Sequence, residues 1–287
     1  MQSLSARVQR FVLLPTVALL VTAFARSQEV GTLTLLRDSP LHVFRGVSML
    51  QGVEGMKLRQ GDILETGPAG TAQAQLEFSG GAVVEIGPSS QVFLLSQSGA
   101  AADIVLLSGW LKGETAAGSY RYSSPLAAAT TKGGNVLLHA TGDAVDVFVE
   151  RGTASVTGGS GAAIVSAPGK IFFTRKSGKP LVPAERPSRD FIAAMPICFR
   201  DVLPPRLDAF AGKKPPTPKS DHDVAYAEVE RWLTLPPAWR RGFVARFRPR
   251  LQDRVFRQAI EEHLKALPDW EPVLHPEDHK TGAAPAD

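Results

Sequence analysis

Residues 72–78 are AQAQLEF, a stretch in which small or apolar side chains alternate with glutamine and glutamate. Residues 145–149, VDVFV, show a similar alternation of valine with Asp146 and Phe148. A period of two places one set of side chains on a buried face and the other towards solvent or a second layer. Glycine pairs, which reach the positive φ of tight turns, separate such runs. Residues 30–175 therefore predict many short strands in a sandwich, barrel or solenoid.

Two stretches of this region echo each other. Residues 104–111, IVLLSGWL, and residues 147–154, VFVERGTA, both run from an apolar strand through a glycine into a second short strand. Two copies are too few for a repeat protein, which needs three or more. We expect two stacked β-hairpins, each turning at its glycine, within one domain.

Five motifs follow one another in an order that can be compared with a known family. They are GDILETGPAG (61–70), VVEIGPSSQV (83–92), LLSGWL (106–111), YSSPLA (122–127) and VFVERGTASV (147–156). In this order they resemble the FecR domain family, whose domains open with GD-x-[LI]-x-T-G and close with V-x-V-x-x-G-x-V-x-V. Two departures are Ser79-Gly80-Gly81 in place of an Asp-Gly turn and Gly133-Gly134-Asn135 in place of Gly-Thr.

The resemblance covers about half of the chain and carries expectations about fold and function. It implies a mainly β protein, with a FecR-like flattened β-solenoid or sandwich over residues 28–175. The regulators that name the family span the inner membrane and carry a cytoplasmic anti-sigma segment before the membrane helix. Only residues 1–10 precede the apolar run of this chain, so we expect that segment to be absent. The resemblance then implies an exported β-rich domain rather than a sigma-factor regulator.

The N-terminal residues predict an export signal. Arg7 and Arg10 precede an uncharged apolar run over residues 11–25, which is shorter than the roughly 20 residues of a membrane span. The alanines at positions 23 and 25 suit a signal peptidase, so we assign residues 1–27 to a signal peptide. The alternative is an uncleaved membrane anchor. Cleavage predicts a periplasmic protein, or an extracellular one in a single-membrane host, without stable membrane insertion.

The C-terminal third changes in character. Residues 176–220 are rich in proline and lysine and predict linkers or extended packing arms around a short helix at 190–199. Residues 221–270 predict a small helical region, with Asp221 or Asp223 capping a helix at 224–233. The strongest helical pattern is 251–267, with its apolar stripe at Leu251, Val255, Phe256, Ala259, Ile260 and Leu264. Residues 271–287 predict a disordered tail.

Charge is concentrated within the predicted helical region. Residues 231–257 hold eight arginines and one aspartate, whereas the formal net charge of the whole chain is only +4. One interpretation is a solvated face with internal ion pairs. The other is a surface for an anionic partner, either an envelope protein or a glycan. Its candidate partner-binding residues are Arg240, Arg241, Arg246, Arg248, Trp239 and Trp232. Export argues against nucleic acid as the partner.

No catalytic motif stands out in the sequence. There is no G-x-S-x-G elbow and no H-E-x-x-H helix, and the single cysteine, Cys198, excludes an intramolecular disulfide. We therefore expect no enzyme, no cofactor and no metal site. Trp110 and Phe148 are more typical of core packing than of a ligand surface. The sequence favours an exported, non-catalytic binding or scaffolding module of the bacterial envelope. The alternatives are a sensor or regulator of envelope or iron-uptake signalling, and a glycan-binding accessory protein.

Overall fold

The protein is mainly β, as predicted, with a small helical region at its C-terminal end. The computed structural model describes residues 28–98, 101–158, 164–165, 171–202 and 204–276. The predicted signal peptide and residues 277–287 lie outside the described residues. The strands form one large, open, mixed sheet and not a closed barrel.

The elements follow one another in an order that separates strands from helices. The strands are β1 (Glu29–Arg37), β2 (Leu41–Arg45), β3 (Ser48–Gln51), β4 (Lys57–Arg59), β5 (Ile63–Thr66), β6 (Gln73–Phe78), β7 (Ala82–Ile86), β8 (Gln91–Ser98), β9 (Ala101–Thr115), β10 (Ser119–Ser123), β11 (Ala128–Ala140), β12 (Ala144–Thr157), β13 (Ile164–Val165), β14 (Ile171–Lys176), β15 (Val182–Ala184) and β16 (Ser220–Asp223). The α-helices are α1 (Arg189–Ala194), α2 (Tyr226–Leu233), α3 (Pro237–Arg240), α4 (Phe243–Phe247), α5 (Arg254–Glu262) and α6 (Glu271–Leu274). Short 3-10 turns are η1 (Ile197–Phe199), η2 (Leu207–Phe210), η3 (Arg248–Gln252), η4 (Leu264–Ala266) and η5 (Pro268–Trp270).

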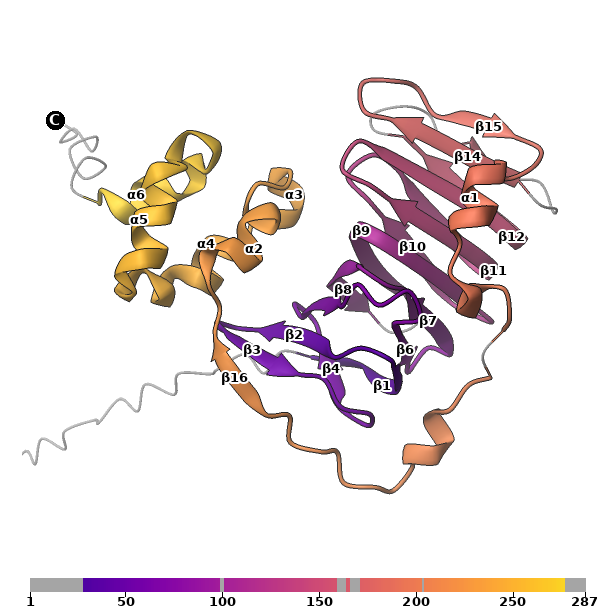
Figure 1. Ribbon diagram of the computed structural model, residues 1–287, viewed down its shortest axis with the longest axis horizontal. Coiled ribbons are helices and arrows are strands. Elements are labelled where there is room, and N and C mark those ends of the chain that lie inside the picture. The colour runs from indigo at the N-terminus through magenta and orange to yellow at the C-terminus, as the bar shows by residue number, and fades with distance from the viewer. Residues whose placement is uncertain (1–27, 99–100, 159–163, 166–170, 203, 277–287) are drawn as a thin grey trace, which may run out of the picture.

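The sheet bends over into two layers because long strands belong to both (Figure 1). The first half of β9 pairs with β8 and β10, and its second half pairs with β7 and β11. We call the layer containing β8 and β10 the first layer and the layer containing β7 and β14 the second layer. The layers meet face to face, since a Cβ at Gly113 in the second layer would lie 2.1 Å from the ring of Tyr122 in the first.

Glycines make the bends between the layers. In β9 the core-facing side chains are Ile104 and Leu106 before Gly109, but Leu111 after it, so the alternation shifts by one residue. Gly109 has φ +89°, and Gly152 in β12 has φ +77°. A left-handed residue of this kind produces a bulge that turns the strand. The predicted hairpins at these glycines are therefore wrong: each glycine bends one continuous strand instead of ending it.

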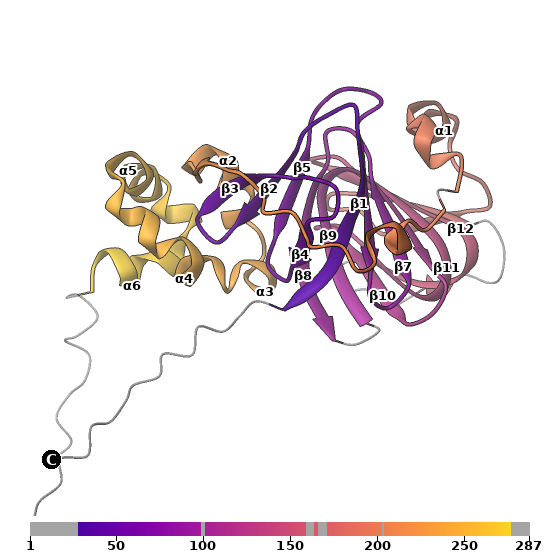
Figure 2. The ribbon, with the colours of Figure 1, turned by 90° about the horizontal axis from the view of Figure 1, so that it is seen from below.

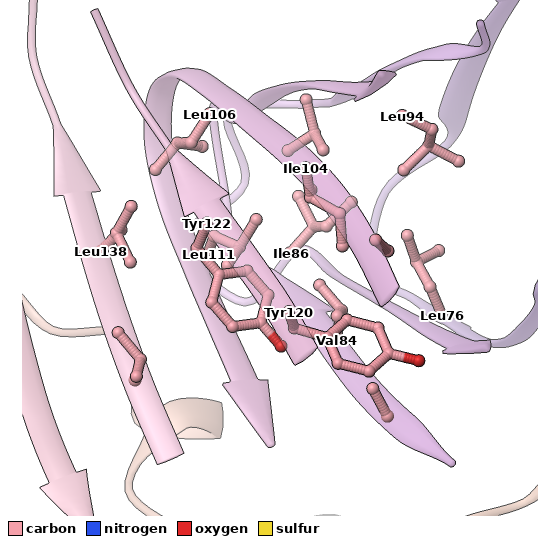
Figure 3. Close-up of a cluster of buried hydrophobic side chains, with 14 of the residues drawn as sticks. Leu76, Val84, Ile86, Leu94, Ile104, Leu106, Leu111, Tyr120, Tyr122 and Leu138 are labelled. Carbon is pink, nitrogen blue, oxygen red and sulfur yellow. The ribbon is translucent and has the colours of Figure 1, made fainter. Parts of the chain in front are cut away.

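The main core fills the space between the layers. Figure 3 shows Tyr120 and Tyr122 of β10 among Leu111, Ile104 and Leu138 from neighbouring strands. Phe78 of β6 meets the edge of the Tyr120 ring, with 6.0 Å between ring centres. All of these side chains are buried. Apolar burial of this extent is the principal stabilising contribution to the fold.

The C-terminal third covers the outer faces of both layers (Figures 1 and 2). Phe191 of α1 and Phe199 of η1 pack on Trp110, Phe148 and Phe172 of the second layer. The chain then follows the edge of the β region to β16, which pairs with β3. Beyond β16, helices α2 to α6 cover the first layer. Residues 176–220, expected to be linkers or packing arms, thus include one helix that is packed on the sheet.

Several details of the predicted C-terminal region are wrong. The predicted disordered tail, 271–287, begins with helix α6, whose Leu274 is buried in the protein. Asp221 and Asp223 lie in β16 and do not cap a helix; α2 starts at Tyr226, where the Glu228 carboxylate accepts from the Ala225 N–H at 2.7 Å. The helix predicted over 251–267 begins at Arg254, because Asp253 accepts from the first backbone N–H groups of α5. It ends at Glu262, and residues 264–266 form the separate turn η4. Val255, predicted to belong to the apolar stripe, is instead 76% exposed at the start of α5.

Candidate functional site: the helical layer and the strap

The helical layer, residues 226–274, is held on the first layer by a second apolar cluster. Phe44, Ile63, Phe93 and Val105 point outward from the strands into this cluster. Trp232 of α2 lies within it, 1% exposed, and meets Phe93 edge to face with ring centres 5.9 Å apart. Trp239 is partly buried against the same cluster. The two tryptophans that sequence analysis selected for partner binding therefore pack within the protein.

Arg246 joins the helical layer to the strands through backbone carbonyls. Its guanidinium donates to the carbonyl oxygens of Phe44 at 2.7 Å, Gly46 at 2.8 Å and Gly61 at 2.6 Å. It also lies over the ring of Phe247, 4.8 Å from the ring centre. Burial lowers the pKa of Arg246 to about 10, so the group stays charged at neutral pH. A planar group with several donors suits this role, which a lysine could not reproduce.

Two further arginines hold the helical layer together. Arg250 donates to the Val224 carbonyl at 2.9 Å and to Asp253 at 2.8 Å. Arg240 pairs with Asp269 at 2.7 Å, and its side chain is only 12% exposed. These contacts agree with the first interpretation of the basic segment, in which its arginines form ion pairs within the protein. Arg250 was not selected from the sequence, because nothing in its spacing distinguishes it from its neighbours.

Arg241 and Arg248 differ from these arginines. Both are exposed, and no hydrogen bond or ion pair joins either side chain to another residue in the part of the chain that the structure describes. Arg241 directly follows Arg240 at the end of α3, and Arg248 begins η3 directly after α4, the helix that contains Arg246. Each exposed arginine therefore lies close in sequence to an arginine that anchors the layer. The structure thus divides the predicted arginine patch into two structural members and two exposed ones.

A polar arrangement that sequence analysis did not select lies on the second layer. The strap, residues 196–202 and 204–207, crosses the outer face of β6, β7 and β9. The Glu77 carboxylate accepts from the backbone N–H of Arg206 at 2.7 Å and of Leu207 at 3.0 Å. The Lys112 ammonium, almost fully buried, donates to the Phe199 carbonyl at 2.8 Å. The polar members of the alternating stretch 72–78 therefore face a second covering layer and not solvent.

The residues Trp110, Phe148 and Cys198 belong to one apolar cluster on the outer face of the second layer. Trp110 and Phe148 pack with Phe191, as expected for core residues. His139 stacks on Trp110 with ring centres 3.9 Å apart. Burial raises the pKa of the Cys198 thiol to about 11, with the nearby Glu85 as a second cause, so the thiolate is a minor species at neutral pH.

Within the described ranges, no group of three or more histidine, cysteine, aspartate or glutamate side chains is placed to hold a metal ion. In the same ranges, no helix combines the length and apolar character that crossing a bilayer requires.

Comparison with known proteins yields only distant structural matches. No protein-family model matches the chain, and no curated protein does. Two crystal structures, at 2.50 Å and 1.65 Å resolution, of a "putative anti-sigma factor from Parabacteroides distasonis ATCC 8503" match 46% and 45% of this chain. The TM-scores are 0.39 and 0.37, with 12% and 11% sequence identity. The match spans 63% of each of those chains, which is less than two thirds of their length. Values this low establish neither a shared fold nor a shared function.

Proposed function

We propose that this protein is an exported, FecR-like, non-catalytic binding module of the bacterial envelope, and that its helical layer presents Arg241 and Arg248 to an acidic protein partner. The observation that carries this proposal is the division of the arginines. Arg240 and Arg246 are engaged in holding the layer in place, whereas Arg241 and Arg248 are exposed without a partner in the described residues.

The rigidity of the surrounding layer supports a binding role. The helical layer is fastened by the apolar cluster around Trp232 and by three hydrogen bonds from Arg246. Arginines on an anchored scaffold lose less conformational freedom on binding than arginines on a flexible tail. Guanidinium groups also bind carboxylates in a bidentate manner, which favours an acidic partner over a neutral one.

Crosslinking in living cells tests this proposal. A photoreactive residue is placed at Arg241 or Arg248, and as a control at Lys132, which is exposed on β11 away from the helical layer. We expect one envelope protein to be captured from the two arginine positions and not from Lys132. The double variant Arg241→Glu/Arg248→Glu should abolish capture through a crosslinker placed at the neighbouring Ala245, while the protein keeps its wild-type melting temperature.

The other outcomes separate the alternative functions. Capture of a sigma-factor system or its receptor would favour the sensor-regulator. Co-sedimentation with cell-wall sacculi that depends on the two arginines would favour the glycan-binding accessory protein. Equal capture from all positions, or capture that survives the double glutamate substitution, would refute the proposed surface.

A further inference from the structure

A small cavity lies under the strap, on the opposite side of the β region from the helical layer. Its volume is about 180 Å³, and it opens between the strap and the adjoining ends of β1 and β6. Ligand pockets for drug-sized molecules start at about 300 Å³, so this cavity suits a smaller ligand. Arg37, Asp38, Thr71 and Gln73 line it from the sheet side, and Ile197 and Asp201 line it from the strap.

Gln73 places an unpaired, buried carboxamide beside this cavity. Its side chain is 1% exposed, and within the described residues neither the amide oxygen nor the amide nitrogen has a hydrogen-bond partner. Buried polar groups are nearly always paired, so an unpaired carboxamide beside a cavity requires an explanation. A bound group that offers one donor and one acceptor, such as a peptide amide, would satisfy both of its atoms.

Charged side chains of both signs surround this carboxamide. Arg37 is the direct cross-strand partner of Gln73 in the β1–β6 ladder, so the two side chains start side by side. Asp38 follows with the unusual left-handed φ of +59°, and Asp201 approaches from the strap. No ion pair joins Arg37, Asp38 or Asp201 to another described residue. Arg37 is suited to a carboxylate, and the two aspartates are suited to an ammonium.

We infer that this cavity binds a short peptide with free ends, of about dipeptide size. Its amide would pair with Gln73, its carboxylate with Arg37 and its ammonium with Asp38 or Asp201. Ile197 would cover an apolar side chain of the peptide, since Ile197 is 73% exposed at the rim. This site is independent of the arginines of the helical layer, and either can fail without the other.

Titration of the full chain with alanyl-alanine tests the inference. Binding is measured by isothermal calorimetry and by the side-chain NH₂ resonances of glutamine in NMR spectra. We expect the free dipeptide to bind and to shift the Gln73 resonance, which is identified by its absence in Gln73→Met. N-acetyl-alanyl-alanine amide, which has no charged ends, should bind at least roughly ten-fold more weakly. The Arg37→Ala variant should lose at least roughly ten-fold in affinity, whereas the control Arg59→Ala, at an exposed position of β4, should not.

The Gln73→Met variant should change dipeptide affinity and thermal stability in opposite directions. It should lose dipeptide binding and yet raise the melting temperature by about 2–4 °C, because the unpaired carboxamide is replaced by an apolar side chain of similar length. Should Gln73→Met fail to fold, Arg37→Ala still tests the site, because Arg37 is exposed. No binding at about 10 mM dipeptide, equal binding of the blocked peptide, or full affinity in Arg37→Ala would overturn the inference. If the dipeptide does not shift the Gln73 side-chain NH₂ resonance, the peptide does not pair with Gln73, and this result too would overturn the inference.

Discussion

Replacing Arg246 by methionine should loosen the helical layer from the strands. The guanidinium donates three hydrogen bonds of 2.6–2.8 Å to the carbonyls of Phe44, Gly46 and Gly61. Hydrogen bonds to a charged group contribute about 1.5–3 kcal/mol each, but burying the guanidinium opposes that gain. Its removal takes the donor from three carbonyls, and leaving a buried acceptor unpaired costs about 1–3 kcal/mol, so we expect a loss of about 3–5 kcal/mol. Methionine keeps an unbranched apolar side chain beside Phe247, so the loss reports on the guanidinium, through its three hydrogen bonds and its position over the Phe247 ring.

Urea unfolding followed by tryptophan fluorescence and by circular dichroism measures this loss. The chain has four tryptophans, of which Trp232, Trp239 and Trp270 belong to the helical layer and Trp110 to the second layer. Fluorescence should therefore report mainly on detachment of the helices, and it should change at a lower urea concentration than the circular dichroism of the β-sheet. Arg241→Met is the matched control and should change the free energy of unfolding by less than about 0.5 kcal/mol. A loss below about 1 kcal/mol in Arg246→Met would refute the proposed anchoring role.

Two further predictions concern a bend and a titrating group. Gly152→Ala should destabilise the fold by more than about 2 kcal/mol in urea unfolding, because φ is +77° and the new Cβ would lie 2.4 Å from the Gly133 carbonyl oxygen. The control Gly142→Ala, whose Cβ would have nothing within 4 Å, should stay within about 0.5 kcal/mol of wild type. Equal losses in the two variants would contradict the role of Gly152 in the bend. Hydrogen bonds to Asp221 and Glu228 raise the pKa of His222 above 6.5, its value in the unfolded chain. The stabilisation from protonated His222 is therefore complete below pH 6.5 and is lost as pH rises through the higher pKa of the folded state. The melting temperature of wild type should therefore fall more than that of His222→Gln from pH 6 towards pH 8, and parallel curves would contradict this role.

Local sequence patterns predicted much of the secondary structure. Alternation identified strands such as β6 and β12, and Pro196 ended the short helix α1 where expected. The helix around α5 was found as well, but its start was misplaced by three residues because the Asp253 cap was not recognised, and its predicted end at 267 lies beyond the observed end at Glu262. Such boundaries depend on one side-chain hydrogen bond, which apolar periodicity does not reveal.

The site residues were harder to assign from the sequence. Arg240, Arg241, Arg246 and Arg248 look alike in the sequence, since all lie in one basic segment. Only the docked position of α4 brings Arg246 to three backbone carbonyls, one in β2 and two in the turns at Gly46 and Gly61, and leaves Arg248 facing solvent. Gln73 gave no signal either, because alternation places the polar residues towards solvent or a second layer and does not distinguish one of them from the others.

By itself, the sequence of this protein determined the class of its elements: a long strand-rich region with glycine at its turning points, followed by proline-rich arms and short amphipathic helices. These features are local, since alternation, glycine φ preference and helix capping act over a few residues. The tertiary structure alone decided that Gly109 and Gly152 bend strands between two layers, that residues 189–199 cover one outer face, and that arginines of one segment divide into anchors and exposed groups. Each of these depends on contacts between residues far apart in the chain, which no local pattern encodes.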